Sequence, residues 1–185
     1  IIVSTLKKLP CVAGRFERVE AGQKFTVIVD YAHTPDGLEN VLLSAREICK
    51  GRLIVVFGAG GDRDRTKRPI MGAIAARLAD FVIVTSDNPR TEDPYRIMEN
   101  ITNGIIQELE QVEPSKRFKY LMEEDRYTAI RTAVSAALPD DVIVIAGKGH
   151  EDYQIFRDRT IYFDDRVVSG NIIQEILTNV PDHSG

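Results

Sequence analysis

Four short polar segments of the sequence contain the residue types that bind charged small molecules, and each follows a run of apolar residues. In Asp87-Asn88-Pro89-Arg90 an acid, an amide and a guanidinium stand on one turn. An acid can pair with an ammonium group and a guanidinium with a carboxylate, so this turn predicts a site for a zwitterion such as an amino acid. The alternative is an ordinary turn, because Asn-Pro is a turn dipeptide.

A glycine-rich segment lies earlier in the chain, at residues 58–65. It does not match a dinucleotide-binding fingerprint, because Arg63 stands where the third glycine would be, and no Gly-Lys-Ser/Thr follows to form a phosphate loop. A dehydrogenase is therefore disfavoured. Five charged residues within 62–67 are costly to crowd together without partners, and Arg63 is a candidate for bidentate capture of a carboxylate. A flexible turn is the alternative.

A third segment, Gly147-Lys148-Gly149-His150-Glu151, combines flexible backbone with an acceptor. The glycines allow a ligand to approach the backbone closely, and Glu151 adds a carboxylate for an amine. A lone Gly-x-Gly is usually only a loop. Three such polar turns after three strongly apolar runs form a stronger signal than any one of them alone.

The fourth segment, residues 30–36, begins with Asp30 at the end of an apolar run. Thr34 and Pro35 have the types that cap and start a helix, which explains them without any function. That explanation does not cover Asp30, which could accept hydrogen bonds from sugar hydroxyls, or His33, which could contact a phosphate or a base. Arg15, which precedes the first strong apolar run, has the profile of an ordinary surface arginine.

These segments need a scaffold that brings them to one place. Short β-branched runs alternate with longer amphipathic ones, which favours an α/β fold with a mostly parallel sheet, helices on both faces and a short C-terminal β-hairpin. In such sheets ligands bind at the carboxyl ends of the strands, where the polar segments fall. We predict strands at 25–29, 53–57, 81–85, 119–122 and 142–146, helices at 36–49, 69–78, 94–109, 125–137 and 165–177, and a hairpin of 154–156 with 160–163.

Composition limits the partners. The 185 residues are 43% apolar and 28% charged with a net charge of −4, as expected for one soluble globular domain. A general nucleic-acid or anionic-membrane binder would be basic, so neither partner is expected. No apolar run approaches the roughly 18 residues of a membrane span. Cys11 and Cys49 lack disulfide or metal spacing, which favours a reduced, cytoplasmic protein.

Together, these segments resemble the Mur ligase family in order and spacing. The resemblance extends from about Val12 to about Leu177, and the turn at 87–90 resembles the branch that takes diaminopimelate. It implies a Rossmann-like third domain at 13–178, the end of a linker from a central domain at 1–12, and a polar tail at 179–185. The segments that carry it are Gly14-Arg15-Phe16, residues 30–36, Gly60-Gly61-Asp62-Arg63-Asp64, residues 87–90 and residues 147–151.

The resemblance also implies a reaction. The enzyme would be an ATP-dependent, amide-forming ligase that adds meso-diaminopimelate to UDP-MurNAc-L-Ala-D-Glu during peptidoglycan precursor synthesis. ATP would phosphorylate the D-glutamate side chain, and the amine of diaminopimelate would then displace phosphate. We expect a cytoplasmic monomer whose Mg²⁺ ligands, and most contacts to the UDP-MurNAc-dipeptide, lie in other domains. No catalytic residue and no metal ligand is expected in this one.

Individual roles follow from the resemblance, position by position. Arg15 and Asp30 would contact the ribose and nearby phosphates of ATP, with His33 beside them. Arg90 would bind the distal carboxylate of diaminopimelate, and Asp87, Glu151 and the Gly147 backbone its distal ammonium. The full set for diaminopimelate is Arg63, Asp87, Asn88, Pro89, Arg90, Gly147 and Glu151. The alternatives are a lysine-adding ligase, a folate polyglutamate ligase, or a non-catalytic nucleotide- or amino-acid-binding module. Lysine has no distal carboxylate for Arg90, which argues against the first.

Overall fold

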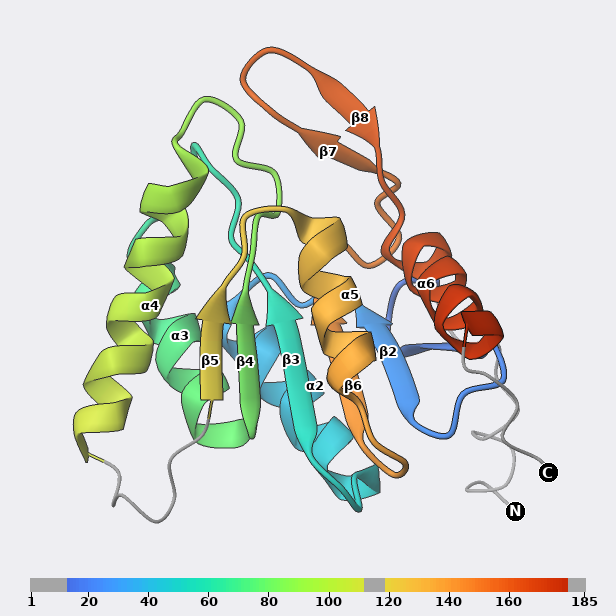
Figure 1. The fold of residues 1–185 in the computed structure, drawn as a ribbon. Helices are drawn as coiled ribbons and strands as arrows, with labels where there is room; N and C mark the ends of the chain where they lie inside the picture. Colours follow the sequence, from blue (N-terminus) through green and yellow to red (C-terminus); the bar gives the residue numbers. More distant parts are fainter. Residues whose placement is uncertain (1–12, 112–118, 180–185) are drawn as a thin grey trace, which may run out of the picture.

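The computed structural model describes residues 13–111 and 119–179 (Figure 1). The predicted linker segment 1–12, which includes Cys11, and residues 180–185 of the predicted tail lie outside the described residues. The strands are β1 (Glu17–Val19), β2 (Thr26–Asp30), β3 (Leu53–Phe57), β4 (Phe81–Val84), β5 (Lys119–Met122), β6 (Val142–Ala146), β7 (Tyr153–Ile155) and β8 (Thr160–Tyr162). The helices are α2 (Pro35–Ile48), α3 (Lys67–Leu78), α4 (Pro94–Gln111), α5 (Arg126–Ala136) and α6 (Asp165–Asn179).

Six strands form one sheet in the order β1-β2-β6-β3-β4-β5. All neighbouring pairs from β2 to β5 are parallel, and only β1 is antiparallel. The predicted α/β class and mostly parallel sheet are confirmed. The sequence analysis did not predict β1, because three residues with one exposed and two half-buried side chains give no alternation to recognise.

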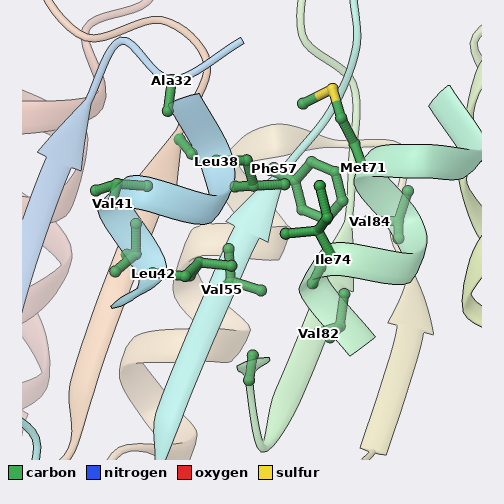
Figure 2. Close-up of a cluster of buried hydrophobic side chains, with 14 of the residues drawn as sticks. Ala32, Leu38, Val41, Leu42, Val55, Phe57, Met71, Ile74, Val82 and Val84 are labelled. Atoms are coloured by element: carbon green, nitrogen blue, oxygen red, sulfur yellow. The ribbon is translucent and has the colours of Figure 1, made fainter. Parts of the chain in front are cut away.

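Two apolar cores cover the two faces of the sheet. One packs α2, α3 and α4 against one face, and the other packs α5 and α6 against the opposite face (Figure 1). Figure 2 shows the first core, where Leu38 and Leu42 of α2 lie close to Val55 of β3. Every residue of β3 and of β6 is buried, as their unbroken apolar runs predicted. Each fully buried aliphatic side chain contributes about 1.5–3 kcal/mol, so the sheet is a rigid support for the loops at its ends.

Predicted element boundaries differ from the observed ones by at most two residues, and those of β3, β5 and β6 coincide. Helix α3 begins at Lys67 rather than at Pro69, because a proline within the first helical turn removes no required hydrogen bond. Helix α2 begins as expected, with the Thr34 side chain accepting a hydrogen bond from the Gly37 amide at 3.2 Å. Asp125, predicted as the first residue of helix α5, instead caps it by accepting a bond from Thr128 N.

The β7–β8 hairpin projects beyond the carboxyl ends of the central strands (Figure 1). Two hydrogen bonds attach it to the turn that follows β4. The Arg90 amide donates to the Ile155 carbonyl at 3.0 Å, and the Ile155 amide donates to Asn88 Oδ1 at 2.9 Å. The hairpin and this turn therefore form one support at the edge of the sheet where ligands bind in parallel α/β folds.

Candidate functional site

A cavity of about 480 Å³ lies at the carboxyl ends of β2, β3, β4 and β6. We call it the carboxyl-end cavity. It brings together six of the seven residues predicted to bind diaminopimelate, and His33 lines it as well. Pro89 is not among its lining residues. The lining consists of Tyr31, His33, Thr34, Gly60, Arg63, Asp64, Lys67, Asp87, Asn88, Arg90, Gly147, Glu151 and Tyr153.

The buried carboxylate of Asp87 depends on the glycine opposite it. Asp87 is only 7% exposed. Gly147 has a φ of +120°, which L side chains rarely adopt, and a Cβ at this position would lie 2.5 Å from Asp87 Oδ2. Gly147 is therefore required twice, once for its backbone conformation and once for the space that the carboxylate fills.

The Asn88 amide is bound within the protein rather than left for a ligand. Its Oδ1 accepts from Ile155 N at 2.9 Å and from Lys148 Nζ at 3.3 Å. Its Nδ2 donates to Glu151 Oε2 at 3.0 Å, and Lys148 Nζ lies 3.4 Å from that same carboxylate oxygen. Asn88 therefore orients Glu151 and the hairpin, and its direct contact with the amino acid stays a prediction.

Lys148 is a buried cation that the sequence analysis did not select. Burial lowers the pKa of its ammonium group, and the nearby Asp87 carboxylate opposes that shift. Its Nζ lies 5.3 Å from the centre of the Tyr153 ring. The nearby Glu151 carboxylate raises the pKa of Tyr153. The available signal was a lysine set between two glycines directly after a buried strand.

Arg90 adopts an unusual backbone conformation beside the cavity, with a φ of +52°. Its Nη1 donates to the carbonyl oxygens of Gly61 at 3.0 Å and Asn88 at 3.3 Å. Among the described residues these bonds use only Nη1, so Nη2 and Nε remain for a carboxylate. Left-handed backbone at a non-glycine residue is costly and is found most often at binding sites. Arg63 is exposed on the opposite loop.

A fully buried arginine supports the cavity from below. Arg126 forms an ion pair with Asp165, with N–O distances of 2.8 and 2.7 Å. It also donates to the carbonyls of Ser86 at 3.1 Å and Ala146 at 3.2 Å, the residues just before Asp87 and Gly147. Burial alone would lower the pKa of Arg126, but Asp165 more than offsets this and the pKa is raised. Arg126 therefore fixes the starting points of two cavity loops.

The crowded charges of residues 62–67 are largely paired within the protein. Thr91 Oγ1 donates to Asp62 at 2.8 Å, and Lys67 Nζ donates to the His33 carbonyl at 2.7 Å. Hydrogen bonds from Thr91 lower the pKa of Asp62. These pairings explain most of the charge density that the sequence analysis found costly.

A second hollow of about 370 Å³ adjoins the cavity, and His33 lines both. Arg15 and Asp30 also line it, as does Tyr31, whose ring centre lies 4.6 Å from that of His33. The Asp30 carboxylate accepts backbone N–H bonds from Phe16 at 2.7 Å and Ala32 at 2.8 Å. A carboxylate has about four acceptor positions, so Asp30 braces its loop and retains capacity for a sugar hydroxyl. The three residues predicted to contact ATP thus share one concave surface.

Comparison with known families identifies the chain. The model of the Mur ligase, glutamate ligase domain, matches residues 14–149. The chain belongs to the Mur ligase family. The resemblance seen in the sequence motifs is confirmed, and the matched region contains every predicted site residue except Glu151.

Individual relatives of this Mur ligase domain agree on one activity. A UDP-N-acetylmuramoyl-L-alanyl-D-glutamate–2,6-diaminopimelate ligase of Syntrophomonas wolfei is 53% identical over 174 residues, covering 94% of this chain and 34% of the relative. The same-named ligase of Clostridium botulinum is 54% identical, covering 95% of this chain and 35% of the relative. The chain therefore spans about a third of the length of these curated relatives.

A solved structure of a ligase with that name is 39% identical to this chain, with a TM-score of 0.79. The match covers 95% of this chain and 34% of the other. This likeness confirms the predicted Rossmann-like α/β fold with its C-terminal hairpin. The chain thus matches about a third of longer proteins that share its fold and much of its sequence.

Two further observations concern metal and membrane. Within residues 13–111 and 119–179, no three His, Cys, Asp or Glu side chains are grouped so that they could hold a metal ion. We assign no role to a metal among these residues. The same residues contain no helix that is both long and apolar enough to cross a bilayer.

Proposed function

We propose that this chain is the amino-acid-binding, C-terminal domain of an ATP-dependent ligase that adds meso-diaminopimelate to UDP-MurNAc-L-Ala-D-Glu. The names of relatives more than 50% identical to the chain support this choice. The product is an amide of a peptidoglycan precursor. We further propose that the complete enzyme is a cytoplasmic monomer.

The carboxyl-end cavity is the observation that carries the proposal. It combines the carboxylates of Asp87 and Glu151 with the guanidinium groups of Arg63 and Arg90. Diaminopimelate has an ammonium and a carboxylate at each end, so a site that holds it needs both kinds of partner. In our proposal Asp87, Glu151 and the Gly147 backbone bind the distal ammonium, and Arg90 binds the distal carboxylate.

The domain would act by positioning. An amine attacks an acyl phosphate productively only when the reacting atoms are held close and aligned, and holding them can supply a large part of the rate. Pairing the distal end of diaminopimelate in the cavity leaves its other amine free to point outward toward the activated carboxylate. We assign no general base to this domain.

The nucleotide would be shared with the rest of the enzyme. Arg15, Asp30 and His33 offer one concave surface for the ribose and nearby phosphates. The described residues contain no cluster suited to Mg²⁺, so the metal ligands belong to other parts of the ligase in our proposal, as do most contacts to the UDP-MurNAc-dipeptide.

The test is substrate-dependent ADP release by the complete ligase that contains this chain. With UDP-MurNAc-L-Ala-D-Glu and ATP present, we expect diaminopimelate to support turnover at least tenfold more efficiently than lysine. A higher kcat/KM with lysine or with glutamate would overturn the proposal in favour of a lysine-adding or folate-type ligase. The 185-residue chain alone should release no ADP. If it turned over at the rate of the complete enzyme, our proposal that catalysis needs the other parts of the ligase would be wrong.

A further inference from the structure

Lys148 is a cation in the proposed amino-acid site, but it is not among the residues proposed to contact diaminopimelate. Resting on the proposed function, we propose that Lys148 is a positioning residue for diaminopimelate. Its ammonium group fixes the orientation of the Asn88 amide and the Glu151 carboxylate, and it sets the net charge of the pocket that receives the distal ammonium.

The orientation of Asn88 follows from the donors around it. Lys148 has a fully buried side chain, and its ammonium group has only donors. It lies 3.3 Å from Asn88 Oδ1, which also accepts from Ile155 N at 2.9 Å. Two donors on one side require the oxygen of the amide there, so Nδ2 must point the other way, where it donates to Glu151 Oε2 at 3.0 Å. Because Oε2 is engaged by both Asn88 and Lys148, Oε1 is left for the ligand.

The charge balance points to the same role. Asp87 and Glu151 are two carboxylates lining one cavity, and they would repel each other without a nearby cation. Lys148 offsets one of these charges, and the buried pair Arg126–Asp165 below is neutral by itself. Arg63, Lys67 and Arg90 also line the cavity, and Lys148 is the cation that lies 3.4 Å from the Glu151 carboxylate. Tyr153 covers the ammonium of Lys148 from the hairpin side, with its ring centre 5.3 Å away.

Removing the cation should therefore change amino-acid use specifically. In Lys148→Met the side chain keeps its length but loses its charge, so Asn88 Oδ1 keeps only the Ile155 N donor and Glu151 loses a donor. The loss of hydrogen bonds to a charged group predicts a KM for diaminopimelate higher by about ten- to a hundredfold. The pocket also becomes more negative by one charge. The distal end of lysine is a cation whereas that of diaminopimelate is a zwitterion, so the preference for diaminopimelate over lysine should fall.

The experiment compares steady-state kinetics of the complete ligase as wild type, Lys148→Met and Lys24→Met. Lys24 is exposed, and it serves as the matched control for loss of one lysine charge. We expect Lys148→Met to raise KM for diaminopimelate, to leave KM for ATP within about twofold, and to narrow the ratio of kcat/KM between diaminopimelate and lysine. Lys24→Met should match wild type. An unchanged KM for diaminopimelate, or equal changes in both KM values, would overturn the role of Lys148.

A measurement on the wild-type ligase covers the case in which Lys148→Met does not fold. Ammonium protons of a buried, hydrogen-bonded lysine exchange slowly, so the Nζ resonance of Lys148 should be visible by ¹⁵N-lysine NMR. We expect diaminopimelate to shift this resonance and lysine to shift it less. A resonance that responds to neither amino acid would overturn the inference while leaving the proposed function intact. A wild-type enzyme without diaminopimelate-dependent ADP release would overturn the proposed function as well.

Discussion

Both ends of the central sheet contain charged side chains, but the charges at the two ends have different partners. At the amino ends of the strands, Asp141 accepts from Arg52 N at 2.6 Å and Leu138 N at 2.9 Å, and it pairs with the Arg52 guanidinium at 2.6 Å. Asp80 accepts from Leu53 N at 2.7 Å and pairs with Arg46 at 2.9 Å. At this end the carboxylates bind amides and guanidinium groups of the protein itself.

At the carboxyl ends the pairing is reversed, because parallel strands end there in carbonyl groups rather than N–H groups. Cations satisfy these carbonyls, as Arg126 does for Ser86 and Ala146, and as Arg90 does for Gly61. In our proposal the Asp87 carboxylate at this end binds a ligand ammonium. The amino ends of the strands would therefore contain groups that stabilise the fold, and the carboxyl ends would contain groups that bind the ligand, as in other parallel α/β folds.

Arg90→Ala should have the largest effect on the function of the carboxyl-end cavity. Lysine lacks the distal carboxylate and leaves Arg90 unpaired even in the wild type, so the variant should impair use of diaminopimelate far more than use of lysine. Leaving a half-buried charge unpaired typically costs about 2–5 kcal/mol, or roughly thirtyfold to several thousandfold in kcat/KM. Kinetics of the complete ligase with both amino acids measure this.

Arg63→Ala is the companion variant, because Arg63 would bind the α-carboxylate that both amino acids share. It should lower both efficiencies by similar factors. Equal losses in Arg90→Ala would mean that the turn at 87–90 acts on a group common to both substrates, and the proposed selectivity would be wrong.

Gly147→Ala should have the next largest effect, through the position of Asp87. The added Cβ would lie 2.5 Å from Asp87 Oδ2, so the carboxylate must move, and KM for diaminopimelate should rise by about tenfold or more. Gly22→Ala is a matched control, because Gly22 also has positive φ, at +95°, but its Cβ would meet only Leu177 Cδ1 at 3.7 Å. Both variants should lose about 1 kcal/mol of stability to backbone strain. A normal KM in Gly147→Ala would contradict the placement of the ammonium site.

At the opposite end of the sheet, Asp141→Asn should change stability and leave the kinetics intact. Burial alone would raise the pKa of Asp141, but hydrogen bonds from Arg52 and from backbone amides outweigh it and hold the pKa below its ordinary value of 3.8. A carboxylate with a lowered folded-state pKa stabilises the fold above its unfolded-state value, and this contribution is lost as the pH falls through the folded-state pKa. We expect the variant to lose about 1–2 kcal/mol at neutral pH.

Urea unfolding of the chain between pH 7 and pH 2.5 measures this loss. The difference between wild type and Asp141→Asn should shrink below about pH 4, as Asp141 becomes protonated in the wild type. Asp158→Asn, at the exposed hairpin tip, should change stability by less than about 0.5 kcal/mol at any pH. A constant difference across the whole pH range would show that the Asp141 charge is not the cause.

The smallest expected effect concerns the nucleotide. Arg15, Asp30 and His33 cover only part of ATP, so the 185-residue chain should bind it with a Kd of about 1 mM, or roughly −4 kcal/mol. At 1 mM ATP this adds only about 0.4 kcal/mol of stability. Calorimetric titration checks the value, and a micromolar Kd would favour a self-sufficient nucleotide-binding module over one domain of a ligase.

Sequence reasoning predicted the fold well where apolar periodicity decided it. The strands β3 and β6 are buried along their whole lengths, as their unbroken apolar runs predicted. Sequence reasoning also placed Arg63, Asp87, Arg90, Gly147 and Glu151 at one edge, because parallel strands bring the loops after them together. It missed β1, whose three residues depend on pairing with β2 rather than on any pattern of their own.

Sequence reasoning could not predict the residues that support the site, because their roles depend on partners that are distant in sequence. Arg126 is an ordinary residue of a predicted helix until Asp165, 39 positions later, pairs with it. Arg68 is fully buried because Glu92 and Asn100 lie across the loop. The supporting contacts of Asn88 were likewise not predicted, because its bonds to Lys148 and Ile155 join segments that are more than 50 residues apart in sequence.

The two hydrogen bonds between the β7–β8 hairpin and the turn at 87–90 have a consequence for protein engineering. Ile155 receives a bond from the Arg90 amide and donates one to the Asn88 side chain, so the hairpin holds the turn at 87–90, our proposed specificity determinant, in its strained conformation. A graft of residues 87–90 alone into a homologous scaffold would separate the turn from this clamp. Redesign of amino-acid choice therefore has to treat residues 87–90 and 147–162 as one transplantable module, although the chain encodes them far apart.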